Sequence, residues 1–137
     1  MSRSLDAFFR PRSVAVVGAS HDPLGMVRDA QFGPLVVLGF GGIYVEILKD
    51  TTTRLAPVDR ADALLMIHEL RMAPALEGAR GRPAADLDTL ADTISRFSWL
   101  AAGADELAEI EINPLGAGAS GTRALDVRAI RRAQETP

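Results

Sequence analysis

Two stretches with helical periodicity occupy the middle of this 137-residue chain, between groups of short strand-like runs. Asp59 is typical of a helix N-cap and predicts a helix from Arg60 to about Met72, which Pro74 should end. Asp86 in the same way predicts a second helix that continues to about Ala102. The apolar stripe of the second helix is expected at Leu87, Leu90, Ile94, Phe97 and Leu100.

Short apolar and β-branched runs flank this helical middle. The expected strands are 13–17, 35–38, 43–49 and 51–55 before it, and 108–112 and 124–127 after it. The last two should be joined by the glycine-rich segment Gly116–Gly121, and Asp22–Gly25 is a predicted turn. This order of elements fits an α+β layer with mixed or antiparallel pairing better than a doubly wound sheet.

Composition favours one compact domain, because 137 residues lie near the usual domain size and 47% apolar residues suffice for a core. The net charge of −3 and the pI near 5.3 argue against nucleic acid or a membrane surface as partner, since such partners usually need a basic face. The absence of cysteine excludes disulfides and thiol chemistry. No leader or long apolar span is evident, so a cytoplasmic location is expected.

Three oxygen-bearing side chains lie near the ends of the last two expected strands. Glu111 and Asn113 belong to Glu-Ile-Asn-Pro-Leu, and Asp126 ends Arg-Ala-Leu-Asp. Such a cluster suits Mg²⁺ bound to a nucleotide phosphate, because Mg²⁺ prefers hard oxygen ligands and retains several waters. The alternative is that Glu111 and Asn113 are the solvent-facing residues of an amphipathic strand, and that Asp126 caps a final helix.

Two glycine-containing segments are candidates for phosphate contacts. The backbone of Gly39–Gly42 is suited to a close approach, with Glu46 on the following strand facing either a nucleotide cleft or bulk water. The segment Gly78–Pro83 carries two arginines, whose planar donors suit phosphate. A hairpin or bulge explains the first segment equally well, and a solvated loop explains the second.

Several segments resemble, in order, the carboxyl-terminal half of an ATP-grasp domain. The likeness is to NDP-forming acyl-CoA synthetases, which include ADP-forming acetate–CoA ligase and relatives of succinyl-CoA synthetase. The segments are Asp29-Ala-Gln-Phe-Gly-Pro, Gly39-Phe-Gly-Gly-Ile-Tyr-Val-Glu46, Arg54-Leu-Ala-Pro57, Leu76-Glu-Gly-Ala-Arg-Gly-Arg-Pro83 and Glu109-Ile-Glu-Ile-Asn-Pro-Leu115. The resemblance implies ATP or ADP with Mg²⁺ as cofactor. It places the metal at Glu111, Asn113 and Asp126, and the nucleotide at Gly41, Gly42 and Glu46.

The amino-terminal residues Leu5–Ser20 resemble the opening of the CoA-binding Rossmann domain of the same family. By this resemblance, Gly18, Ala19 and Ser20 would approach CoA. We therefore expect a remnant of that domain at residues 1–25 and an ATP-grasp subdomain at 26–137, with the intervening family domains missing. Half a Rossmann unit lacks the helix N-terminus and crevice that CoA needs, so CoA binding is expected to be lost.

The histidines bear on catalysis, because these synthetases relay a phosphoryl group through a histidine on a mobile loop. Neither His21 nor His68 matches that position, and the only lysine, Lys49, does not match a phosphate ligand of the family. The sequence thus predicts a ligase fragment that contributes part of an ATP and Mg²⁺ site and is inactive alone. The alternative is a noncatalytic module that associates with itself or with a full-length synthetase.

The apolar run Ser13–Val17 should not remain in water, since a Rossmann strand is normally covered on both faces. We expect it either to add to an edge of the sheet formed by 35–49 or to stay mobile and drive association.

Overall fold

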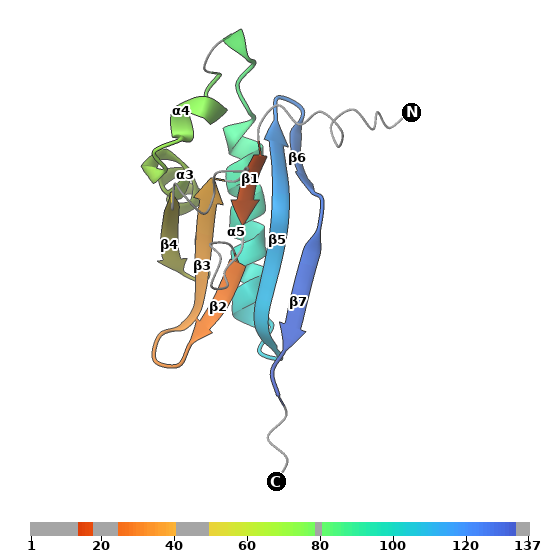
Figure 1. Ribbon diagram of the computed structural model, residues 1–137. Coiled ribbons are helices and arrows are strands. Elements are labelled where there is room, and N and C mark those ends of the chain that lie inside the picture. The colour runs from red at the N-terminus through yellow and green to blue at the C-terminus, as the bar shows by residue number, and fades with distance from the viewer. Residues whose placement is uncertain (1–13, 18–24, 41–49, 79–80, 134–137) are drawn as a thin grey trace.

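The computed structural model describes residues 14–17, 25–40, 50–78 and 81–133. Its elements, in chain order, are β1 (Val14–Val17), β2 (Gly25–Asp29), β3 (Gly33–Phe40), β4 (Thr51–Leu55), α3 (Arg60–Glu69), α4 (Ala73–Leu76), α5 (Leu87–Gly103), β5 (Leu107–Gly118), β6 (Gly121–Ala124) and β7 (Val127–Arg131). The strands form one sheet, and α3 and α5 lie behind it in Figure 1. The predicted strand 43–49 falls in a part of the chain that is not described.

Every described strand pairing is antiparallel, which confirms the expected α+β class. We call each position across the sheet a lane. From one edge, the lanes are β4, then β3, then β1 and β2 end to end, then β5, then β6 and β7 end to end. The long strand β5 thus has neighbours on both sides: β7 and β6 pair with it between Leu107 and Gly118, and β2 and β1 pair with it between Glu109 and Gly116.

The predicted amino-terminal strand is present as β1, but its position corrects the expectation of an edge. β1 pairs with β3 on one side and with β5 on the other, so it lies in the interior of the sheet. Val17 is opposite Leu38, and Gly25, the first residue of β2, is opposite Val37. The two short strands therefore occupy successive register positions of one central lane.

The carboxyl-terminal strands also differ from the prediction. Most of the glycine-rich segment Gly116–Gly121 is not a loop, because β5 continues to Gly118 and β6 begins at Gly121, where φ is +107°. The final segment Val127–Arg131 is the strand β7, so the alternative that Asp126 caps a last helix is wrong. Strand β2 was not predicted at all, since it is short and contains both Arg28 and Asp29.

The hydrophobic core lies between the sheet and the two long helices. Met26, Leu38 and Leu115 on the sheet are at most 1% exposed, as are Met66 and Ile94 on the helices. Burying a side chain of this size stabilises the fold by about 1.5–3 kcal/mol relative to leaving it in water. No helix among the described residues is long and apolar enough to cross a membrane.

Helix α5 begins as predicted, because the Asp86 carboxylate accepts a hydrogen bond from the Thr89 N–H at 2.9 Å. Its buried face differs from the predicted stripe near the end of the helix. Leu100 is 55% exposed, whereas Ala101 and Ser98 are fully buried. The buried Ser98 hydroxyl accepts a hydrogen bond from the Val58 N–H at 2.9 Å, so this polar residue has a partner within the core.

Helix α3 has the predicted N-cap at Asp59 but ends at Glu69, three residues before the predicted end. The buried carboxylate of Asp50 accepts hydrogen bonds from the N–H groups of Arg71 at 2.8 Å and Met72 at 2.9 Å. These amides are therefore held by a residue outside the helix. Pro74 does not end α3, since it lies in the first turn of α4.

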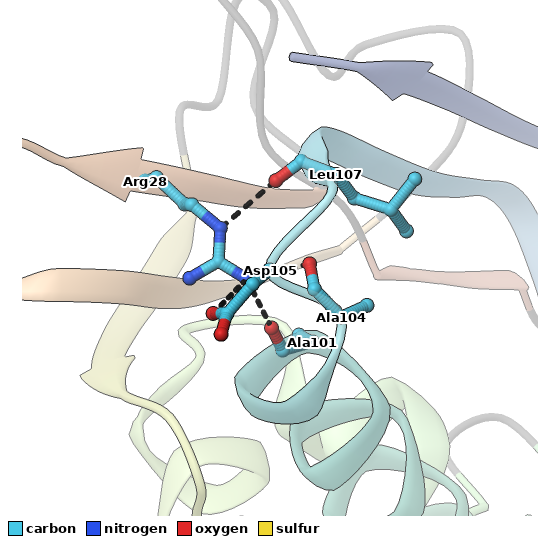
Figure 2. Close-up of polar contacts among 5 residues, drawn as sticks. All are labelled: Arg28, Ala101, Ala104, Asp105 and Leu107. Atoms are coloured by element: carbon cyan, nitrogen blue, oxygen red, sulfur yellow. Dashed lines mark hydrogen bonds and ion pairs between the residues drawn. The ribbon is translucent and has the colours of Figure 1, made fainter. Parts of the chain in front are cut away.

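Arg28 connects the end of α5 to the start of β5 (Figure 2). Its Nε donates to the Leu107 carbonyl oxygen at 2.8 Å, and Nη2 donates to the carbonyl oxygens of Ala101 at 3.1 Å and Ala104 at 2.7 Å. Nη2 also lies 3.6 Å from Asp105, whose side chain is 88% exposed. A cation at a helix C-terminus satisfies carbonyls that have no partner within the helix.

We predict that Arg28→Met lowers the free energy of unfolding by about 2 kcal/mol or more, because it removes charge-assisted hydrogen bonds to three carbonyls. Urea denaturation followed by circular dichroism measures the change. Arg96→Met is the matched control, because Arg96 is 82% exposed and its one ion pair, with Asp92, is long at 4.0 Å. This control should change stability by less than about 0.5 kcal/mol. Equal losses in both variants would contradict the assigned role of Arg28.

The pH dependence of stability should reflect the Asp86 cap. The Thr89 hydroxyl, at 2.6 Å, and then the Thr89 N–H hold the pKa of Asp86 below its ordinary value. A lowered folded-state pKa stabilises the protein above the unfolded pKa of about 3.9, and this contribution disappears as the pH falls through the folded pKa. Asp86→Asn keeps a residue that can cap the helix but removes the carboxyl group that titrates. The stability difference between wild type and variant should be constant above about pH 5 and narrow below about pH 4.

Candidate functional site

The face of the sheet opposite the helices carries the candidate site. Ile110 on β5 is buried against the helices, so Glu109 and Glu111, one residue to either side of it, project from the opposite face. Glu111 is opposite Arg128 of β7 in the register. We call this side of the sheet the open face, since no described helix covers it.

Four side chains make a connected group on the open face, which we call the carboxylate cluster: Glu109, Glu111, Asn113 and Arg128. The Nη2 atom of Arg128 lies 2.5 Å from Oε1 of Glu109 and 3.3 Å from Oε2 of Glu111. The Asn113 Nδ2 donates to Oε1 of Glu111 at 3.1 Å. The two glutamate side chains are only 18% and 14% exposed, so a neighbouring cation compensates for their partial burial.

The structure brings together the three residues that the sequence assigned to a metal. Glu111 and Asn113 are hydrogen-bonded through their side chains, and the main-chain N–H of Asn113 donates to the main-chain oxygen of Asp126 at 3.0 Å. Asp126 is exposed and lies between β6 and β7, opposite Asn113. The assignment itself stays a prediction, because proximity shows that a shared ligand is possible and not that one binds.

The sequence reasoning missed two members of the carboxylate cluster. Glu109 precedes Glu111 by two residues, so strand alternation alone places both on one face. Arg128 carries no comparable local signal, because its position opposite Glu111 depends on the register of β7.

Within 14–17, 25–40, 50–78 and 81–133, no group of three or more His, Cys, Asp or Glu side chains is arranged to hold a metal ion.

The donor set nevertheless fits Mg²⁺ bound together with a phosphate. One or two carboxylates with an amide oxygen provide the hard ligands that Mg²⁺ prefers, and phosphate oxygens and waters complete its shell. Glu111 and Asn113 supply such oxygens next to each other.

The other predicted ligands lie outside the described residues. They are Gly18, Ala19, Ser20, Gly41, Gly42 and Glu46, together with Arg80 of the segment Gly78–Pro83. His21 and Lys49, which were not assigned a role, also lie outside the described residues. The remaining histidine, His68, is exposed on α3, with its Nδ1 3.2 Å from Oε1 of Glu77. A helical position with an acidic neighbour does not resemble a mobile histidine loop.

Comparisons with known proteins agree with this fold. Residues 16–130 match the ATP-grasp domain family. The acetate–CoA ligase [ADP-forming] I subunit beta of Pyrococcus furiosus is 48% identical over 107 residues, which cover 78% of this chain and 46% of the subunit. The 4-hydroxybutyrate–CoA ligase [ADP-forming] of Nitrosopumilus maritimus is 39% identical over 115 residues, which cover 82% of this chain and 16% of that enzyme.

A solved structure shows the same arrangement. The dinucleotide-forming acetyl-coenzyme A synthetase 1 of Ca. Korarchaeum cryptofilum, in complex with coenzyme A and Mg-AMPPCP, superposes with a TM-score of 0.79 at 33% identity. The superposition covers 88% of this chain and 53% of that one. The chain belongs to the ATP-grasp domain family, and the likeness to NDP-forming acyl-CoA synthetases inferred from its sequence is confirmed. It spans about half the length of the Pyrococcus subunit, or less for the longer relatives.

We predict a measurable coupling between Arg128 and Glu109, because the glutamate is only 18% exposed. A double-mutant cycle of Arg128→Ala and Glu109→Ala, measured by urea unfolding, should give about 0.5–1 kcal/mol of interaction free energy. The exposed pair Arg96 and Asp92 is the control and should give about zero. A coupling no larger than that of the control would show that the ion pair does not help to hold the cluster.

Proposed function

We propose that the open face forms one side of the nucleotide and Mg²⁺ site of an ADP-forming acid–CoA ligase. The single observation that carries this proposal is the contact of Glu111 with Asn113 on an uncovered sheet face, in a chain of this family. The Korarchaeum relative in complex with coenzyme A and Mg-AMPPCP supports nucleotide and metal as the ligand class.

Glu111, Asn113 and Asp126 are the residues proposed to hold the metal. When bound, Mg²⁺ would neutralise charge on the phosphate oxygens of the nucleotide. The chain's own residues prepare this position. Arg128 compensates the charge of both glutamates, and the hydrogen bond from Nδ2 of Asn113 to Glu111 uses its amide nitrogen, which leaves its amide oxygen for a cation.

The complete reaction, from ATP, a carboxylate and CoA to acyl-CoA, ADP and phosphate, is proposed for an enzyme of which this chain represents a part. The chain alone is proposed to be inactive, because phosphoryl transfer depends on positioning the phosphates from several sides. Nucleotide contacts at Gly41, Gly42 and Glu46 are part of this proposal. So are the assignment of residues 1–25 to a CoA-binding remnant with Gly18, Ala19 and Ser20, and the loss of CoA binding.

A second candidate function is a noncatalytic module that pairs with itself or with a full-length synthetase. The apolar residues of the open face favour it. Leu55, Leu35 and Val27 follow one another across β4, β3 and β2 in the register, and Leu55 and Val27 are 52% and 37% exposed. An apolar surface of this kind commonly binds another protein.

We predict that ADP binds weakly and only with Mg²⁺, with a dissociation constant of about 1 mM, equivalent to about 4 kcal/mol. Isothermal titration of the wild type and of the Asn113→Ala, Asp126→Ala double variant measures this. The double variant should lose the Mg²⁺-dependent heat, whereas Asp62→Ala, a substitution on the exposed side of α3, should retain it. Tight binding that persists in the double variant would refute the site assignment.

A further inference from the structure

The central lane of the sheet is built from two pieces of chain. β1 and β2 both run antiparallel to β3, so they point in the same direction. Val17 and Gly25 are opposite the adjacent residues Leu38 and Val37, although residues 18–24 separate them in the sequence. β1 therefore completes the lane as a separate segment and does not continue directly into β2.

The neighbours of β1 define a slot, which we call the β1 slot: Leu38–Phe40 of β3 and Ile112–Gly116 of β5. Ala15 is paired on both sides, with Phe40 and with Leu115. Two residues of the slot, Leu38 and Leu115, are at most 1% exposed, so the slot belongs to the interior of the domain. Main-chain groups in the interior need a partner, because buried N–H and C=O groups without hydrogen bonds are strongly unfavourable.

We propose that the β1 slot is a strand-binding site in which Val14–Val17 is an exchangeable occupant, and that the same strand of a second copy of this chain can replace it. The main-chain ladder recognises an extended peptide, as in other cases of strand addition. Residues 18–24 reach about 25 Å when extended, which lets β1 leave its slot without detaching β2. This inference is independent of the nucleotide site.

The covalent connection between β1 and β2, residues 18–24, favours the chain's own strand as the occupant of the β1 slot. This covalent attachment of β1 to β2 raises the effective concentration of the chain's own strand, so a second copy competes only at high protein concentration or when the chain's own strand is impaired. The described strand β1 is four residues long. Its opening should therefore require less free energy than unfolding of the whole domain.

Amide hydrogen exchange in the full-length wild type tests whether β1 is an exchangeable occupant. The paired amides of Val14–Val17 should exchange at least tenfold more slowly than in an unstructured peptide, and at least tenfold faster than the core amides of Val36 and Ile94. Exchange at the unstructured rate would show that the slot is not filled. Exchange at the rate of the core amides would show that β1 is an integral strand, and either result overturns the proposal.

A labelled peptide spanning Arg12–Gly18 tests whether the slot accepts the strand of another molecule. Ala15→Pro removes an N–H from the middle of β1 and should free the slot. By fluorescence anisotropy this variant should bind the peptide at least tenfold more tightly than the wild type does. A peptide with proline at position 15 should not bind. If Ala15→Pro folds only when the peptide is added, the gain of circular dichroism signal supports the proposal. The proposal is overturned if the Ala15→Pro variant neither binds the peptide nor folds when the peptide is added.

Association through the open face would also produce dimers, so a control must separate the two cases. We expect wild-type protein at millimolar concentration to form dimers in size-exclusion chromatography with light scattering, and excess peptide to dissociate them. Val27→Asp, on the open face, should leave these dimers unchanged. Dimers that are lost in Val27→Asp but resist the peptide would assign the association to the open face and refute strand exchange.

Discussion

Strand β5 is the element on which both the core and the candidate site depend, because antiparallel pairing fixes it on both sides. β1 and β2 pair with one edge, and β6 and β7 pair with the other. Alternation along a strand then sends Ile110 to the helices and Glu109 and Glu111 to the open face. The positions of the carboxylates are therefore set by the same register that buries the core. A shift by one residue would exchange the two faces.

The start of β5 is fixed by contacts far from it in sequence. Arg28 of β2 binds the Leu107 carbonyl oxygen and the last carbonyls of α5, so it sets where the chain leaves the helix and enters the strand. Two residues later, Glu109 is opposite Val27 of β2. Strand β2 thus controls β5 through its backbone pairing and through one nearly buried guanidinium group, which is 10% exposed.

The sequence was sufficient to predict features that depend on contacts between residues close together in the chain. The caps at Asp59 and Asp86 were found because each acts within its own first helical turn. The predicted end of α3 was wrong because Asp50, a residue distant in sequence, accepts hydrogen bonds from the amides that follow the helix. The glycine-rich hairpin was misread since glycine also marks loops. The Arg128 contact depends on a strand pairing that a single sequence does not reveal.

The carboxylate cluster is suited to exchanging one cation for another. Glu109 and Glu111 are 18% and 14% exposed and need a nearby positive charge, whereas Arg128 is 56% exposed and can move into water at little cost. A divalent ion that approaches from the open side meets two partly buried carboxylates whose present partner is easily displaced. In the proposed site, an ion that displaces Arg128 and recruits Asn113 would bind weakly unless a phosphate completes its shell. This asymmetry of exposure supports the proposal that metal and nucleotide bind together.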